Sequence, residues 1–221
     1  MGIKENLIKI KEQIGNHNVK IIAVTKYANQ EQILEAYKLG VSDFGESYAQ
    51  DARKKLSIKE IENSENLNWH FIGRLQKNKA KYVVGDFCFI HSVDSIELAD
   101  LINTIAIKKG LKQDILLQVN ISKEETKSGF SPNELRDSFK NLVSLSNVTI
   151  KGLMTMAPKT DDKEIIKSCF SGLFDLREEL NKLNLINLKE LSMGMTNDYR
   201  EAIKCGATMI RIGRGIFNNN Y

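Results

Sequence analysis

The chain contains 221 residues, of which 42% are hydrophobic, a length and composition that allow one sizeable core. Lys and Arg number 32 and Asp and Glu 28, so the net charge of +4 excludes a highly charged disordered chain and lacks the strongly basic character of nucleic-acid-binding proteins. Only 2 prolines occur and no Gly/Ser-rich stretch could serve as a linker, so residues 1–221 are predicted to form a single domain.

Helical and strand patterns alternate through the first half of the sequence. Apolar residues recur at helical spacing from Ile3 to Ile14, Gly15 ends that helix, and a short β-branched strand follows. The predicted helices cover residues 3–14, 30–39, 46–61, 76–84 and 95–109, and the predicted strands cover residues 19–25, 41–44, 69–72 and 87–91.

The second half repeats this alternation. Ser131, Pro132 and Glu134 form a capping box that opens a helix. Further helices are predicted over 163–183 and 198–205, and strands over 114–121, 148–154, 188–192 and 208–212. Eight strands separated by helices predict an α/β fold, a single (β/α)8 TIM-type barrel. A doubly wound open sheet is the alternative, but the Gly-x-Gly-x-x-Gly fingerprint that would support it is missing after the first strand.

The cysteines and the N-terminus bear on location. Cys88, Cys169 and Cys205 are widely spaced and contain no C-x-x-C pair, which favours a reducing compartment over a disulfide framework or a zinc site. The N-terminal segment is charged and lacks the apolar region of a signal peptide, and runs such as 21–24 are too short to span a membrane. We therefore expect a cytoplasmic protein without membrane, nucleic-acid or metal partners.

Lys26 is the first candidate for chemistry, because a barrel carries its active site at the C-terminal ends of its strands. Burial at such a place lowers the pKa of a lysine, and a neutral lysine amine forms a Schiff base with an aldehyde. A lysine that reaches solvent is the alternative, and Lys26 alone favours it.

Small residues follow the seventh and eighth strands, where barrels commonly bind phosphate. Ser192, Gly194, Thr196 and Gly213 allow backbone N–H groups to approach an anion, and a helix from about residue 197 presents its positive end. These residue types also favour ordinary turns. A Schiff-base lysine facing a phosphate cradle is more specific, and it indicates pyridoxal 5′-phosphate (PLP).

Several segments resemble the YggS/PROSC family, the pyridoxal phosphate homeostasis proteins, in the right order over nearly the whole chain. The segments with the strongest resemblance are 23–26 (AVTK), 44–48 (FGESY), 69–79 (WHFIGRLQKNK), 191–196 (LSMGMT) and 210–213 (IRIG). Within them, the Ser-Met-Gly-Met and Trp-His-Phe-Ile-Gly sequences together are highly specific. The segments 118–122 (QVNIS), 127–129 (KSG) and 152–154 (GLM) agree as well.

This resemblance implies the barrel of the alanine racemase N-terminal domain and a role for each matching residue. Lys26 matches the lysine that holds PLP as an internal aldimine, and Ser192 matches a serine that contacts the phosphate. Gly213 and Arg214 match the rest of the phosphate cradle, and Arg211 matches the arginine that faces the pyridine nitrogen. A permanent cation there keeps the nitrogen unprotonated, so the ring is a weak electron sink.

Three positions depart from the family pattern. Ser47 stands where Asn usually lies near the cofactor 3-hydroxyl, so that contact is lost or bridged by water. Arg74 stands where Pro is common, and Arg214 stands where a small hydroxyl residue touches the phosphate. Arg214 either grips the phosphate or points outward and leaves the contact to backbone N–H groups.

Other candidates have a structural alternative of equal or greater weight. Lys127 is a possible second amine for PLP, although a solvated loop lysine is favoured. Met154 is predicted to lie against the cofactor ring, although a core methionine fits equally. His70 and His91 suit acid–base chemistry, although packed strand histidines are more frequent. The lysines of 77–81 lack interleaved aromatic residues and do not indicate RNA binding.

The predicted function is therefore a carrier that holds PLP, limits the free aldehyde and supplies it transiently to apo-enzymes, with an indirect effect on amino-acid metabolism. A PLP-dependent racemase, or another PLP enzyme with weak activity, is the alternative. Racemisation needs a base on each face of the Cα–H bond, and alanine racemase takes the second from a further domain for which this sequence leaves no residues. A barrel without cofactor ranks last because Lys26, Ser192 and Arg211 are all present. A monomer is favoured over a dimer.

Overall fold

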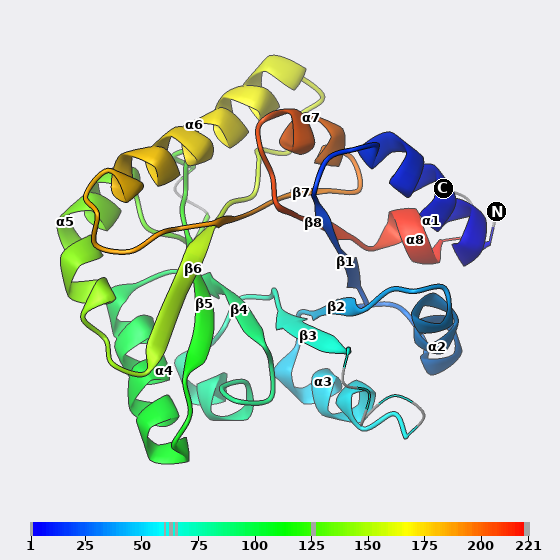
Figure 1. Ribbon diagram of the computed structural model, residues 1–221, viewed down its shortest axis with the longest axis horizontal. Coiled ribbons are helices and arrows are strands. Elements are labelled where there is room, and N and C mark those ends of the chain that lie inside the picture. The colour runs from blue at the N-terminus through cyan, green and yellow to red at the C-terminus, as the bar shows by residue number, and fades with distance from the viewer. Residues whose placement is uncertain (1, 60, 62–63, 65, 125–126, 219–221) are drawn as a thin grey trace.

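The computed structural model describes residues 2–59, 61, 64, 66–124 and 127–218. Within these residues, parallel strands pair in chain order and β8 pairs with β1, so the sheet closes into the predicted barrel (Figure 1). The strands are β1 (Lys20–Val24), β2 (Asp43–Glu46), β3 (Asn68–Phe71), β4 (Phe89–Val93), β5 (Gln113–Gln118), β6 (Val148–Met154), β7 (Glu190–Met195) and β8 (Met209–Ile212).

Helices surround the sheet and bury their apolar faces against it. They are α1 (Ile3–Ile14), α2 (Gln30–Lys38), α3 (Ala49–Leu56), α4 (Ile96–Lys109), α5 (Pro132–Val143), α6 (Lys163–Asn181), α7 (Tyr199–Lys204) and α8 (Arg214–Phe217), with a 3₁₀ helix η1 (Lys77–Tyr82). Figure 1 shows α1 beside α8, where the Asn6 side-chain amide donates to the Ile216 carbonyl at 3.0 Å. This contact ties the N-terminal helix to the last one.

Local sequence rules explain most helix ends. The predicted capping box is confirmed: Glu134 N donates to Ser131 Oγ at 3.2 Å, and Ser131 N donates to Glu134 Oε2 at 3.1 Å. Gly110 ends α4 in the left-handed conformation at φ 66°, which only glycine adopts without strain.

Two predicted helices are wrong in extent. The helix predicted over 46–61 is α3 alone, because Glu46 belongs to β2 and pairs with Phe71; residue 60 lies outside the described residues. The helix predicted over 76–84 is the shorter η1, where Val83 N donates to the Ala80 carbonyl in a three-residue turn.

Strand ends also shift, and this changes the place of the candidate site residues. β1 ends at Val24, so Lys26 lies in the loop beyond it. β7 continues to Met195, which is in register with Arg211, so Ser192 and Gly194 lie inside the strand and not after it. Ser192 and Arg211 therefore belong to the barrel wall, deeper than the loops.

The barrel interior has an apolar part and a polar part. Ile22, Leu116, Met154 and Met209 form a buried cluster separate from the main core between sheet and helices. The polar part contains His70, His91, Ser192 and Arg211, each at most 5% exposed. Burying polar groups inside a barrel is costly unless they bond to one another, so this polar part indicates a functional role.

Among the described residues, no helix is both long and apolar enough to cross a bilayer. The same residues contain no group of three or more His, Cys, Asp or Glu side chains arranged to hold a metal ion.

Candidate functional site

Lys26 lies at the C-terminal end of the barrel between two exposed tyrosines. Its Nζ is 5.0 Å from the ring centre of Tyr27 and 5.2 Å from that of Tyr48. Hydrogen bonding to Tyr27, and then to Tyr48, raises the pKa of the Lys26 amine. The predicted lowering of this pKa is therefore wrong, because the amine is partly exposed and faces two polar aromatic rings instead of an apolar wall.

A buried ion pair supports the segment that carries Lys26. Glu46 is fully buried, and its Oε2 lies 2.6 Å from Lys55 Nζ and accepts from Thr25 Oγ1 at 3.0 Å. Lys55 Nζ also donates to the Thr25 carbonyl at 2.6 Å, and Ser47 N donates to Glu46 Oε1 at 2.7 Å. From the sequence, Glu46 and Lys55 were assigned no site role, because their ion pair joins β2 to α3 and is visible only in the folded chain.

Gly73 brings the end of β3 against the segment that follows β2. A Cβ at Gly73 would collide with the backbone carbonyl of Ser47, so only glycine permits this approach. This contact and the bond from Ser47 N to Glu46 fix Ser47, the residue predicted near the cofactor 3-hydroxyl.

Gly73→Ala is accordingly expected to destabilise the protein by about 2 kcal/mol, because backbone must move away from backbone. Urea denaturation measures this loss. Arg74→Ala, at the exposed neighbour, is the control and should change stability by less than about 0.5 kcal/mol. Equal stability of the two variants would show that the loop adapts.

Arg211 is the buried cation of the site. Its Nη1 donates to Ser192 Oγ at 2.6 Å, and its Nη2 donates to the Thr155 carbonyl at 2.9 Å. Desolvation lowers the pKa of Arg211 to about 10, so the group remains protonated at neutral pH. Ser192 and Arg211, which were predicted separately, are thus in direct contact.

Two histidines continue from Ser192 across the barrel. Ser192 Oγ lies 2.8 Å from His91 Nδ1, His91 Nε2 lies 2.9 Å from His70 Nδ1, and His70 Nε2 lies 2.9 Å from Asp43 Oδ1. Desolvation lowers the pKa of His70 and lowers that of His91 well below its usual value. Bonding to His70 and Ser42 outweighs the opposing effect of burial and lowers the pKa of Asp43 to about 2.

These shifts predict acid sensitivity in a defined window. A histidine that stays neutral when folded gains a proton only on unfolding, so its contribution to stability is complete above the usual pKa of 6.5 and is lost below it. We expect the unfolding free energy to fall below pH 6.5 by up to about 1.4 kcal/mol per pH unit for each such histidine. Urea denaturation at pH 7.5, 6.0 and 5.0 measures the slope, which His91→Gln should reduce. A flat profile would contradict the burial of neutral imidazoles.

The structure supports the predicted phosphate cradle only in part. Gly194 has φ 91°, and a Cβ there would collide with α7, so packing already requires glycine. Gly213 lies against Val24, which brings the turn after β8 close to the Lys26 loop, and Arg214 is exposed.

The helix after β7 begins only at Tyr199, and the Asp198 carboxylate at its start accepts from Met195 N at 2.5 Å. The negative charge of Asp198 offsets the partial positive charge of this helix N-terminus, which was predicted from the sequence to face a phosphate.

The remaining candidates are also placed. Met154 is buried in the interior apolar cluster, one residue before the carbonyl of Thr155 that binds Arg211. Lys127 is not a freely solvated loop lysine, since its Nζ pairs with Glu124 and donates to the Ala157 carbonyl at 3.1 Å.

Comparison with known proteins identifies relatives of the whole chain. Residues 2–220 match the family model "Alanine racemase, N-terminal domain". The pyridoxal phosphate homeostasis protein of Aquifex aeolicus is 38% identical over 98% of both chains. That of Synechocystis is 41% identical over 91% of this chain and 92% of its own.

Solved structures agree. PipY of Synechococcus elongatus, 36% identical, covers 98% of this chain and 100% of its own, with a TM-score of 0.92 for the form without PLP and 0.89 for the form with PLP bound. An alanine racemase of Clostridium difficile is 18% identical with a TM-score of 0.79; 97% of this chain matches 56% of that enzyme, which shows a shared fold.

Proposed function

We propose that this chain, which belongs to the family of pyridoxal phosphate homeostasis proteins, binds PLP as a Schiff base on Lys26 and maintains the intracellular PLP supply. The names of the relatives and the PLP-bound form of PipY support PLP as the ligand. The observation that carries the assignment of Lys26 is the position of this residue in the chain, two residues after Val24 at the end of β1. Val24 lies against Gly213 in the turn after β8, and β1 pairs with β8, the strand that contains Arg211.

The residues of the site fit this ligand. PLP supplies an aldehyde that condenses with a primary amine, together with a phosphate and a pyridine nitrogen. Lys26 offers a partly exposed primary amine, and Tyr27 and Tyr48 restrict its position. Lys26 and Arg211 add positive charge for an anionic ligand, and Arg211 is held rigidly by two hydrogen bonds.

Arg211 also favours a carrier over an enzyme. With a pKa of about 10 it stays cationic, and a cation beside the pyridine nitrogen disfavours protonation of that nitrogen. An unprotonated ring is a weaker electron sink, so it supports carbanion chemistry poorly. We therefore propose that holding and releasing PLP is the main role, that apo-enzymes are transient recipients in the cytoplasm, and that effects on amino-acid metabolism are indirect.

Gly194, Gly213 and Arg214 are proposed to lie on the phosphate side, and Ser47 and Met154 beside the ring. Ser192, predicted to contact the phosphate, is proposed to act from the barrel wall through its bond to Arg211. Lys127 is proposed as a second amine for PLP, and its bond to the Ala157 carbonyl holds it close to the segment after β6. The proposed state of the protein is a monomer.

The test is a visible spectrum of the purified protein with PLP, before and after borohydride reduction, followed by peptide mapping. We expect the absorption of a protein-bound PLP and, after reduction, its attachment to the peptide that contains Lys26. Amino-acid racemisation should stay far below about 1 s⁻¹, the low end of typical enzyme turnover. Turnover at enzymatic rates would overturn the carrier assignment, and attachment to another lysine would overturn the site.

A further inference from the structure

A continuous line of hydrogen bonds crosses the barrel interior beneath the candidate PLP site. It runs from Arg211 on β8 through Ser192 on β7, His91 on β4 and His70 on β3 to Asp43 on β2. Each of these side chains is at most 7% exposed. Strands β4 and β7 are not neighbours in the sheet, so the bond between His91 and Ser192 spans the interior.

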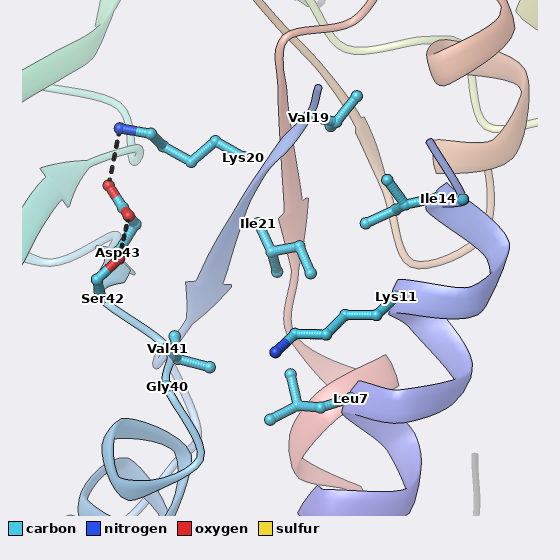
Figure 2. Close-up of a pocket in the computed structure, with 11 residues that line it drawn as sticks. Leu7, Lys11, Ile14, Val19, Lys20, Ile21, Gly40, Val41, Ser42 and Asp43 are labelled. Carbon is cyan, nitrogen blue, oxygen red and sulfur yellow. Dashed lines mark hydrogen bonds and ion pairs between the residues drawn. The ribbon is translucent and has the colours of Figure 1, made fainter. Parts of the chain in front are cut away.

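The line ends at the opposite opening of the barrel. Asp43 begins β2, and Lys20 at the start of β1 lies 3.1 Å from its Oδ1. Figure 2 shows Lys20 reaching across to Asp43, with Ser42 bonded to the same carboxylate at 2.6 Å. The carboxylate is therefore fixed by partners on three sides, since His70 also binds it.

The two ends and the neutrality of both histidines together fix the direction of every proton in the line. Arg211 can only donate, and an ionised Asp43 can only accept. Because both histidines are neutral, His70 must donate from Nε2 to Asp43, and His91 must donate from Nε2 to His70 Nδ1. Ser192 is then left to donate to His91 Nδ1 and accept from Arg211. One arrangement satisfies all five groups.

We propose that His91 and His70 are positioning residues, which carry the orienting effect of Asp43 across the barrel to Ser192 and thereby hold the Arg211 guanidinium in place for PLP. The effect on PLP rests on the proposed function, whereas the proton arrangement does not. Because the Ser192 hydroxyl donates its proton to His91, the lone pairs of Oγ face Arg211 Nη1. This acceptor gives the guanidinium one preferred orientation. Loss of His91 frees that proton and leaves a buried hydroxyl without its acceptor.

The first experiment needs no ligand. The sequence has 3 histidines, and the exposed His17 provides an internal reference for ¹⁵N NMR of the imidazole nitrogens in the apo protein. We expect His70 and His91 to be Nε2–H tautomers at pH 7. An Nδ1–H tautomer or an imidazolium at either residue would overturn the proposed line, whether or not the protein binds PLP.

The second experiment measures PLP affinity in variants. His91→Phe replaces the imidazole by another aromatic ring and removes the hydrogen bonds to His70 and Ser192. It should weaken PLP binding about tenfold or more. His91→Gln offers one acceptor and one donor and should stay within about threefold of the wild type, as should the exposed control His17→Gln. Wild-type affinity in His91→Phe would overturn the positioning role.

Asp43→Asn repeats the affinity test without a change of volume, in case His91→Phe does not fold. The amide oxygen can still accept from His70, but the charge that orients the line is gone. We expect weaker PLP binding and a second tautomer at His70, whereas an unchanged ¹⁵N spectrum would overturn the role of Asp43. If the wild type fails to bind PLP while both histidines show the expected tautomers, the proposed function fails and the proton arrangement stands.

Discussion

Lys26→Ala is expected to abolish covalent retention of PLP, the largest functional effect among our predictions. The variant removes the amine that lies between Tyr27 and Tyr48 at the barrel mouth. Without it no Schiff base forms at this position, so the absorption of bound PLP and the reduced peptide should both disappear. Spectroscopy, borohydride trapping and mass mapping measure the loss.

Two matched variants separate the nucleophile from the charge. Lys26→Arg keeps a cation beside the two tyrosines but cannot form the Schiff base, so it should retain only non-covalent affinity for PLP. Lys204→Ala removes an exposed lysine on α7 and should leave the spectrum unchanged. If Lys26→Ala still traps PLP on a peptide containing Lys127, the covalent site has been assigned to the wrong amine.

Lys55→Met is expected to give the largest loss of stability. It leaves the carboxylate of Glu46, which is fully buried, without its cationic partner. Breaking a buried ion pair by removing one member typically costs about 3–5 kcal/mol. The variant also removes the bond to the Thr25 carbonyl, so the Lys26 segment should loosen and PLP binding should weaken as well.

Urea denaturation measures this effect against two comparisons. The pair of Arg136 and Glu179 is exposed on both sides, so Arg136→Met should cost less than about 1 kcal/mol. The double variant Glu46→Gln with Lys55→Met removes both charges but keeps an acceptor for Thr25 Oγ1 and Ser47 N, so it should recover most of the loss. If Lys55→Met is as stable as Arg136→Met, the pair is more hydrated than its burial indicates.

Local sequence rules located a helix end where a capping residue marks it, and failed where a long-range contact decides it. The capping box at Ser131 and the glycine at 110 report directly on backbone geometry and locate their helix ends. The helix predicted over 46–61 failed because the buried carboxylate of Glu46 looks, in sequence, like the start of a polar helix. Its pairing with Phe71 in the sheet is a long-range contact that no local pattern contains.

In the candidate site, too, some residues were identified from the sequence and others only from the fold. Lys26, Ser192 and Arg211 were found because each follows or belongs to a short apolar strand and matches a family motif. Lys55 was missed because its helix reads as solvated, and only the fold shows that its side chain turns back to Glu46. The pKa of Lys26 was predicted in the wrong direction because its environment comes from Tyr48 in another loop as well as from its neighbour Tyr27.

The sequence by itself determined the barrel, since alternating helix and strand periods with short connections leave few ways to bury eight strands. It also determined which residue types stand near the strand ends. Only the tertiary structure decided that Asp43, His70, His91, Ser192 and Arg211 form one hydrogen-bonded line. These residues lie far apart in sequence, and each strand's pleat decides which side chains face inward. Closure of the sheet then places β4 across from β7, where buried polar groups must bond to one another because an unpaired buried polar group is costly.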